Sequence, residues 1–498
     1  MWVAKMSNNE TDKENGCVYT PPELVNEVLD AAGYVPTEDL SSMTVLEPSC
    51  GDGAFLVGIA SRLVESIHLR TPPSDSAQID REIHEALSDC IMAIEIDGDA
   101  LETAKHRVLD ALEERYEYVP VDGTHVFSRW HTGDAIKYLN DVNDTFDFIV
   151  GNPPYVRIHN VRDIGKLRGI PWCSNGMTDM FYAFYCIGLH HLTENGTLSY
   201  IAQSTWMMAK SGTAMRDELR RNGNVKAVIN HDDDQLFDGI IVYVATTVLT
   251  ARRNEYIEYS SPSTAKFRIP QADAWIDGKF IPIDDESTRA RLNEITSGFF
   301  DDRTVLVRTG FQTGNDAIFL DGENRFPDSM KINVVKASTG DTTQTMFFPY
   351  DEDSKLVQLD EVNKSCIDEG KRPIDDMRES MMGRSGVDDS NWWGYTRTQA
   401  ISAVPVDIVT IPSMLVPGKT GKITKAPAGT GVYGRGYYVT GMTIDDVRSA
   451  LSSRWFAAYA KAFGMRKRGG YFAVSGSDMQ VYLRWYKRRR SVTKEDIG

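Results

Sequence analysis

Short apolar runs typical of β-strands alternate with segments of helical periodicity between Thr44 and Thr250. The apolar runs lie at residues 44–46, 91–94, 146–150, 197–202, 225–229 and 242–249, with helical segments at 55–67, 100–112 and 180–192. In the first helical segment, apolar side chains recur every four residues, as on one face of a helix. Strands that alternate with crossover helices form a mainly parallel sheet, so this half of the chain predicts an α/β domain.

The residue composition changes after residue 250, where a polar and Ser-rich segment begins. From about residue 305 onward, short apolar runs lie among many Gly, Pro, Asp and Thr residues, and a clear helical period returns only at 444–463. This pattern predicts a separate α+β domain that is rich in loops. We therefore place a first domain in residues 1–255, a linker or transition segment in 256–300, and a second domain in 301–498.

The composition indicates a soluble protein. The 498 residues are 41% hydrophobic with a mean hydropathy of -0.34, and no apolar run approaches the roughly 18 residues of a membrane-spanning helix. The N-terminal segment has no apolar leader, so we expect a cytoplasmic protein with no membrane partner. The six cysteines form no CxxC pair and have no regular spacing, so we expect neither a metal site nor disulfides.

The formal net charge of -17 is unfavourable for a nucleic-acid-binding protein, because neutralising phosphates requires clustered Lys and Arg. The C-terminal stretch 466–490 differs, since it carries eight basic residues against the single acid Asp478. Aromatic residues are interleaved with these cations. Either a solvated tail or a folded, ligand-facing surface has this composition, and both interpretations stay open.

A strand, a glycine-rich turn and a helix N-terminus follow one another in residues 46–55, LEPSCGDGAF. Such a turn lets a ligand approach bare backbone at the positive end of a helix dipole, although many α/β proteins need one for steric reasons alone. The turn has neither the GxGxxG spacing of a dinucleotide fingerprint nor the GK[ST] of a P-loop. A pyrophosphate is therefore not the expected ligand.

Two acids follow later strands at positions that suit ligand binding. Glu95 ends the second apolar run, where this kind of fold binds ribose hydroxyls. Asp134 follows the expected end of a third strand, where its carboxylate could accept a hydrogen bond from an exocyclic amine. Taken alone, Glu95 would be interpreted as a helix-capping acid and Asp134 as a turn residue.

The most specific element is the tetrad Asn152-Pro153-Pro154-Tyr155 (NPPY), which directly follows the apolar run 146–150 and Gly151. The two prolines end the strand and fix the backbone, so that an amide side chain projects beside a carbonyl and a tyrosine ring follows. These groups offer two acceptors to one NH2 group and a stacking face to a planar ring. After a sheet strand, in the same domain as a glycine turn and a strand-ending acid, the tetrad predicts a catalytic site.

The order and content of these motifs resemble the gamma group of adenine-N6 DNA methyltransferases, which includes TaqI-like and Eco57I-like enzymes. The resemblance covers about residues 17–250 and implies a Rossmann-like domain that binds S-adenosylmethionine (AdoMet). It implies methyl transfer to N6 of an adenine that is flipped out of duplex DNA, without a covalent intermediate. It also implies a role in restriction-modification or phage defence.

The resemblance further implies which residues form the AdoMet site. They are Tyr19, Thr20 and Pro21, then Glu47, Ser49, Gly51 and Gly53, then Glu95 and Ile96, then Asp134 and Ala135, and finally Asn152 and Phe184. In the family, the first three close over the methionine moiety, Ile96 packs on the cofactor adenine, Asp134 binds its N6, and Phe184 flanks it. The implied catalytic residues are Asn152, Pro153, Pro154, Tyr155 and Phe237, where Phe237 would hold the second face of the target adenine and Tyr243 is the second candidate.

The second half resembles the family's target-recognition domain more weakly, in the stretches 310–319, 391–393 and 469–472. The resemblance implies double-stranded DNA as the partner, and we expect Arg466, Lys467, Arg468 and Tyr471 to bind it. We find no nuclease motif, and the first methyltransferase motif begins near residue 17, so we expect no N-terminal nuclease domain. A separate cognate restriction endonuclease stays open as a partner.

Other protein classes share part of this pattern. Glutamine methyltransferases that act on release factors, and some RNA methyltransferases, use NPPY or related motifs, but they usually lack a C-terminal domain of about 200 residues. A combined restriction-methylation enzyme would need a nuclease in the second half, and an inactive DNA-binding module would need decayed AdoMet motifs, which are intact here. DNA methylation is therefore the main hypothesis, with RNA or protein-glutamine methylation as the alternative.

Overall fold

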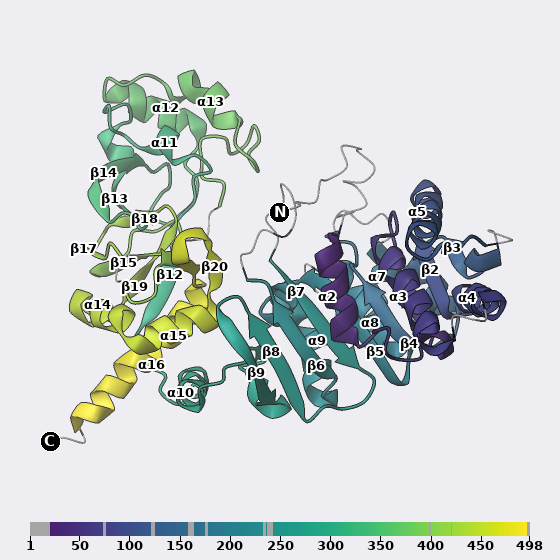
Figure 1. Cartoon of the computed structure of the whole chain (residues 1–498). Helices are drawn as coiled ribbons and strands as arrows, with labels where there is room; N and C mark the ends of the chain where they lie inside the picture. The colour runs from purple at the N-terminus through teal and green to yellow at the C-terminus, as the bar shows by residue number, and fades with distance from the viewer. Residues whose placement is uncertain are drawn as a thin grey trace. The chain divides into compact units, whose positions relative to one another are not determined.

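The computed structural model describes residues 20–72, 76–120, 125–157, 164–174, 178–232, 236, 243–397, 400–419 and 421–495. The chain divides into two compact units, Met1–Asp285 and Glu286–Gly498 (Figure 1). Each unit has its own sheets and its own hydrophobic core. Within the described residues, no helix combines the length and the apolar character that crossing a membrane requires.

A nine-stranded sheet forms the centre of the first unit, in the order β3-β2-β1-β4-β5-β7-β6-β8-β9. Its strands are β1 Val45–Glu47, β2 Ile91–Glu95, β3 Trp130–Thr132, β4 Phe146–Gly151, β5 Leu192–Gln203, β6 Val225–Asn230, β7 Val244–Thr250, β8 Tyr256–Ser261 and β9 Thr264–Pro270. A separate hairpin contains β10 Trp275–Ile276 and β11 Lys279–Phe280. Strands β1 to β5 pair in parallel, and β7 runs antiparallel between β5 and β6, so the predicted α/β class is confirmed.

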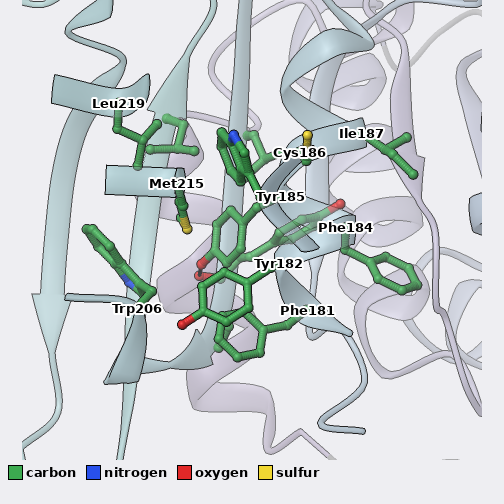
Figure 2. Close-up of a cluster of buried hydrophobic side chains, with 14 of the residues drawn as sticks. Phe181, Tyr182, Phe184, Tyr185, Cys186, Ile187, Trp206, Met215 and Leu219 are labelled. Carbon is green, nitrogen blue, oxygen red and sulfur yellow. Dashed lines mark hydrogen bonds between the residues drawn. The ribbon is translucent and has the colours of Figure 1, made fainter. Parts of the chain in front are cut away.

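Helices cover both faces of this sheet (Figure 1). They are α2 Pro22–Ala32, α3 Ala54–Arg70, α4 Ser76–Cys90, α5 Gly98–Tyr116, α6 Ala135–Asp141, α7 Ile164–Arg168, α8 Phe181–His190 and α9 Thr213–Asn222. Helices α2 to α5 contribute to one core, and α6 to α9 contribute to the other, shown around α8 in Figure 2. Successive strand residues alternate between the two cores, as Val45 and Leu46 do, because strand side chains point to opposite faces in turn.

Some elements of the first unit lie where the sequence indicated no regular structure. Helix α4 precedes β2, where the sequence analysis named no helical segment, because the four-residue spacing of Ile79 and Ile83 is hidden among polar residues. Strands β8 and β9 occupy residues that we placed in a linker, 256–300. Each of these two strands has a single buried residue, because they are the last two strands at one end of the sheet and are largely polar. Strands of this kind give no continuous apolar run.

The second unit contains three small sheets, in the orders β12-β19-β15-β17, β14-β13-β18 and β16-β21-β20. Its strands are β12 Leu306–Thr309, β13 Lys331–Lys336, β14 Asp341–Phe347, β15 Ile408–Pro412, β16 Met414–Leu415, β17 Thr424–Ala426, β18 Gly431–Tyr433, β19 Gly436–Thr440, β20 Met465–Lys467 and β21 Tyr471–Ala473. Its helices are α10 Glu286–Thr296, α11 Asp316–Phe319, α12 Leu359–Asp368, α13 Arg378–Met382, α14 Ile444–Ser452, α15 Arg454–Phe463 and α16 Gly476–Glu495.

The helical period at 444–463 forms two helices, α14 and α15, rather than one. Ser453 lies between them in an extended conformation, and its Oγ accepts a hydrogen bond from the Phe456 N–H at 3.0 Å. This contact caps α15, since the first N–H groups of a helix have no partner within the helix. A serine with a continuous apolar period on both sides is hard to recognise as a cap from sequence alone.

Candidate active site

The strand order of the large sheet reverses between β1 and β4, which are parallel neighbours. In open α/β sheets, ligands bind outside the carboxyl ends of the strands at such a point. Glu47 ends β1 and Gly151 ends β4, and the register pairs Leu46 with Ile149. The glycine turn and the NPPY tetrad therefore leave the sheet side by side.

The turn after β1 depends on two glycines. Gly51 and Gly53 have φ angles of +54° and +89°, a left-handed region that glycine adopts without the steric penalty of a Cβ. A Cβ on Gly53 would lie 2.7 Å from the Cβ of Ala104 in α5, so the glycine allows a close approach to that helix. Arg107 in the same helix anchors the turn, because its Nη1 lies 2.6 Å from the Asp52 carboxylate. Sequence analysis missed Arg107, which no local pattern connects to the turn.

The Glu95 carboxylate joins the glycine turn to the end of β2. It accepts hydrogen bonds from the Gly51 N–H at 2.8 Å and from the Asp97 N–H at 3.0 Å, and the residue is buried. Through these hydrogen bonds Glu95 stabilises the glycine turn and the segment after β2. Its binding of ribose stays a prediction. The next residue, Ile96, is 61% exposed at the carboxyl end of β2, where it is accessible to a ligand.

Two polar groups are buried near the turn. Glu47 is 2% exposed, and within the described residues neither its Oε2 nor the Oγ of Ser49 has a hydrogen-bond partner. Burial, followed by the nearby charges of Glu95 and Asp52, raises the pKa of Glu47 well above its ordinary value. Unpartnered buried polar atoms are uncommon in folded proteins, so this pair indicates a place for a polar ligand.

Asn152 presents a free acceptor beside this place. The preceding Gly151 has φ +149°, and a Cβ there would contact the Glu47 Cγ at 3.5 Å. The Asn152 Nδ2 donates a hydrogen bond to the Thr20 Oγ1 at 3.1 Å, which connects the tetrad to the segment before α2. The Asn152 Oδ1 is buried and has no partner among the described residues. This oxygen is the acceptor that the tetrad predicts for an amine.

The rest of the tetrad is packed into the unit. Pro153 is buried and Pro154 is half-buried. The half-buried Tyr155 ring packs against both cores, and its hydroxyl donates a hydrogen bond to the Ile201 carbonyl at 3.3 Å. Burial raises the pKa of this hydroxyl, so it remains neutral. The hydrogen bond fixes the orientation of the ring, and stacking of the ring on a base stays a prediction.

Asp134 is an exposed residue that caps α6. Its carboxylate accepts hydrogen bonds from the Ile136 N–H at 3.0 Å and the Lys137 N–H at 3.3 Å, and Ala135 follows as a buried residue. Phe184 is 7% exposed, and Figure 2 shows it on the side of α8 away from Trp206 and Met215. The capping contacts agree with the turn interpretation of Asp134, and the contacts of all three residues with AdoMet stay predictions.

Three of the remaining candidates of the first unit, Thr20, Pro21 and Tyr243, lie within the described residues. Thr20 and Pro21 are buried, and Pro21 occupies the N-cap position of α2. Tyr19 and Phe237 lie outside the described residues. Tyr243 immediately precedes β7, and its carbonyl accepts a hydrogen bond from the Ser204 N–H at 2.9 Å.

In the second unit, β20 and β21 form a hairpin that carries the predicted DNA-binding residues. Lys467 pairs with Tyr471 across the hairpin, and Tyr471 is 46% exposed. Arg466 pairs with Phe472, so it belongs to the opposite face of the hairpin from Lys467. The side chain of Arg468 lies outside the described residues.

The other cations of the basic stretch lie on α16, and most of them form ion pairs within the unit. The pairs are Arg484 with Asp301, Lys487 with Asp302, Arg489 with Glu294, and Arg490 with Asp446. The stretch is therefore folded rather than a solvated tail. These four cations stabilise the unit, which reduces the number available to a partner.

Comparison with known proteins shows what the first unit is similar to. Residues 75–237 match the family model of the Eco57I restriction-modification methylase. Over these residues the chain is similar to the Eco57I-like methylases. It is 23% identical to the Type II methyltransferase M.BstVI of Geobacillus stearothermophilus, over 93% of this chain and 89% of the relative. It is also 23% identical to the Type II methyltransferase M.PaeR7I of Pseudomonas aeruginosa, over 92% of this chain and 83% of that protein.

This similarity in sequence agrees with a similarity of fold. The solved structure of the Type IIL restriction-modification enzyme MmeI in complex with DNA matches with a TM-score of 0.60 and 14% sequence identity. The match covers 92% of this chain and 65% of the MmeI chain. At this identity the match shows a shared fold. The family resemblance that the motifs implied is thus confirmed.

Proposed function

We propose that this chain is an AdoMet-dependent DNA methyltransferase that methylates N6 of adenine within a specific sequence, as part of a restriction-modification or phage-defence system. The observation that carries the proposal is the buried Oδ1 of Asn152, which has no partner among the described residues and lies next to the enclosed Glu47, where the strand order reverses. The Type II methyltransferases M.BstVI and M.PaeR7I, which match nearly the whole chain, support DNA as the substrate. A separate cognate endonuclease is the partner that we propose for this role.

The residues at the glycine turn fit AdoMet. This ligand carries an ammonium and a sulfonium group. The enclosed Glu47 carboxyl could form an ion pair with a cation through its Oε2, which has no partner within the described part of the chain. Each Glu95 oxygen accepts one backbone N–H, which leaves lone pairs for ribose hydroxyls. The exposed Ile96 could pack on the cofactor adenine, and Asp134 could accept a hydrogen bond from its amine.

Catalysis would depend on how the tetrad holds the target amine. Bound AdoMet supplies a methyl group that is already activated by its sulfonium. Adenine N6 is a weak nucleophile, because its lone pair is delocalised into the ring. The Asn152 Oδ1 and the Pro153 carbonyl would accept the two N6 hydrogens and favour a more sp3-like nitrogen, and Tyr155 would stack on the ring.

The target base must leave the duplex before it reaches Asn152. Flipping a base costs about a few kcal/mol of pairing and stacking, which contacts on both faces of the base can offset. Tyr155 would provide one face. We propose Phe237 for the other, with Tyr243 as the second candidate.

Methyl transfer to defined acceptors tests the proposal directly. The protein is incubated with labelled AdoMet and, in separate tubes, with duplex DNA, ribosomal RNA or a release factor. We expect label in DNA alone. Label in RNA or in the release factor, with none in DNA, would support the alternative class and contradict the proposal.

Replacing Asn152 tests the role of the tetrad. Asn152→Ala should lower turnover on DNA by roughly 10²–10³-fold, the typical loss of one positioned polar group, while AdoMet affinity is largely kept. Single-turnover rates and calorimetric titration with AdoMet measure the two effects. Asn140→Ala is the matched control, because Asn140 is exposed on α6 and lies outside the proposed site. A normal rate for Asn152→Ala would mean that the amide does not hold the target amine.

A further inference from the structure

One stretch of the second unit is strongly basic, although the chain as a whole is acidic. Residues 408–477 contain ten Lys and Arg residues and only two acids, Asp445 and Asp446, whereas the formal net charge of the whole chain is -17. The strands β16, β21 and β20 belong to this stretch and form one small sheet. Clustered cations favour a polyanionic partner, so the surface of this sheet is a candidate interface.

One face of this sheet carries large side chains that are exposed. Met414 and Met465 each pair with Ala473, and Lys467 pairs with Tyr471. Residues that lie directly opposite each other share a face, as do residues two apart on one strand. Met414, Met465, Lys467 and Tyr471 therefore lie on one face, which we call the hairpin face. Met414, Met465 and Tyr471 are 41%, 53% and 46% exposed.

The other face of the sheet packs into the unit. Leu415, which pairs with Phe472, is 1% exposed, and a Cβ on Gly464 at the end of α15 would lie 3.2 Å from the Phe472 Cβ. The hairpin face is thus the solvent side of a sheet whose inner side is covered. An exposed pair of methionines beside a tyrosine lowers solubility unless a partner covers these side chains.

Three residues, Arg468–Gly470, form the tip of the hairpin. Gly469 and Gly470 have φ angles of +77° and +76°, and a Cβ added to Gly470 would contact nothing within 4 Å. Two of the three tip residues therefore carry no side chain. Such a hairpin could approach another surface closely, so that the side chains of the hairpin face make the contact.

We propose that the hairpin face is an apolar wedge that inserts at a base step of bound DNA. Met414, Met465 and Tyr471 contact the bases, and Lys467 contacts a phosphate. This inference rests on the proposed function, because the partner is then DNA. Apolar side chains that unstack a base step are a known way to bend a duplex, and cations beside them hold the backbone. DNA and an acidic protein surface would both complement the positive charge of the stretch. We favour DNA, because only DNA offers bases for the apolar side chains to contact.

Binding measurements on the full chain test the wedge. The probe is a duplex of about 30 base pairs that contains the sequence found methylated, by long-read sequencing, in cells expressing the chain. Met414→Ala combined with Met465→Ala should raise the Kd about ten-fold without changing its salt dependence, because no phosphate contact is lost. Lys467→Ala should instead reduce the slope of log Kd against log salt by about one. Ile367→Ala, which removes a 62% exposed side chain from α12, is the matched control and should leave both quantities unchanged.

Crosslinking provides a test that does not depend on affinity. Met465→Cys in a Cys17→Ser background should form a disulfide with a thiol tethered to a base, because the other five cysteines are buried. Failure to crosslink together with unchanged affinity of the methionine variant would overturn the proposal. A changed oligomeric state or melting temperature with unchanged DNA affinity would overturn it in favour of a protein contact. If the chain methylates no DNA at all, the proposed function fails first and the wedge fails with it.

Discussion

Two glutamates end neighbouring strands of the first unit, and their surroundings differ. The Glu95 carboxylate receives two backbone N–H groups, whereas Glu47 is enclosed with an oxygen that has no partner in the described residues. The pKa of Glu47 is raised by burial first, so the neutral carboxyl is favoured while no cation is bound. A cationic ligand reverses this preference, because it pairs with the ionised form. Glu47 is therefore the group whose protonation should report AdoMet binding.

We expect AdoMet binding to release a proton from Glu47. Affinity should weaken as the pH falls through the raised pKa, since the carboxyl must then lose a proton to pair with the ligand. Glu47→Gln should bind AdoMet about ten-fold or more weakly, as expected for losing a charged hydrogen bond of roughly 1.5–3 kcal/mol, and should release no proton. Calorimetry in two buffers of different ionisation enthalpy measures the proton count.

Glu47 should also affect the stability of the fold, with a pH dependence opposite in sign to that of AdoMet affinity. A carboxyl whose folded-state pKa is raised favours the folded state at low pH, and this contribution is lost as the pH rises. Glu47→Gln should therefore increase the free energy of unfolding of the ligand-free protein at neutral pH. Glu113→Gln, at an exposed position of α5, is the control for both experiments. Equal proton release by wild type and Glu47→Gln would place the titrating group elsewhere.

The glycine turn and α5 are packed so closely that adding one methyl group at Gly53 should push them apart. Gly33 and Gly53 have nearly equal φ angles of +87° and +89°, but only Gly53 has a neighbour where its Cβ would be. Gly33→Ala should cost about 1 kcal/mol of stability from the backbone alone. Gly53→Ala should cost a further 1–3 kcal/mol, roughly, from overlap with Ala104, and should weaken AdoMet binding. Urea unfolding and AdoMet titration measure the two effects.

A double mutant isolates the overlap between the turn and α5. Ala104→Gly removes the Cβ that Gly53→Ala would meet at 2.7 Å. The combined variant should therefore regain AdoMet affinity relative to Gly53→Ala, although Gly in a helix interior itself costs about 1 kcal/mol. If Ala104→Gly restores nothing, the effect comes from the φ angle or from the Cα of residue 104, which stays 2.9 Å from the added Cβ.

The elements that the sequence predicted well are those in which one local pattern determines the structure. The runs that became β2 and β4 are almost wholly buried, so they are mainly apolar, with Asp147 as the polar residue inside β4, and the NPPY tetrad follows β4 as expected. β8 and β9 were assigned to a linker because each buries one residue in the sheet. In the site, Asn152 was found through its motif. Arg107 was missed because its contact with Asp52 joins residues that are far apart in the chain.

At the scale of the whole molecule, the two units should unfold separately, because each has its own core. The core of the second unit includes a buried cation. The Arg384 guanidinium is 7% exposed in total, donates to the Met381 and Gly394 carbonyls at 2.8 Å each, and also donates to the carbonyls of Thr313 and Trp392. It lies over the Phe319 ring at 4.7 Å. One side chain therefore joins α13 to the loops on either side of it.

Arg384→Met should lower the stability of the second unit alone. It leaves four carbonyls without their donor, and losing one partner of a buried charged network typically costs about 3–5 kcal/mol. Calorimetry of the full chain should show the unfolding transition of the second unit moving to lower temperature. Saturating AdoMet should raise the transition temperature of the first unit alone, since a ligand stabilises the unit that binds it. AdoMet affinity should be unchanged, and methylation of DNA should be lost at temperatures where the second unit is unfolded. Arg435→Met, at an exposed position, should leave both transitions in place. A single transition that responds to Arg384→Met and to AdoMet alike would mean that the two units fold as one.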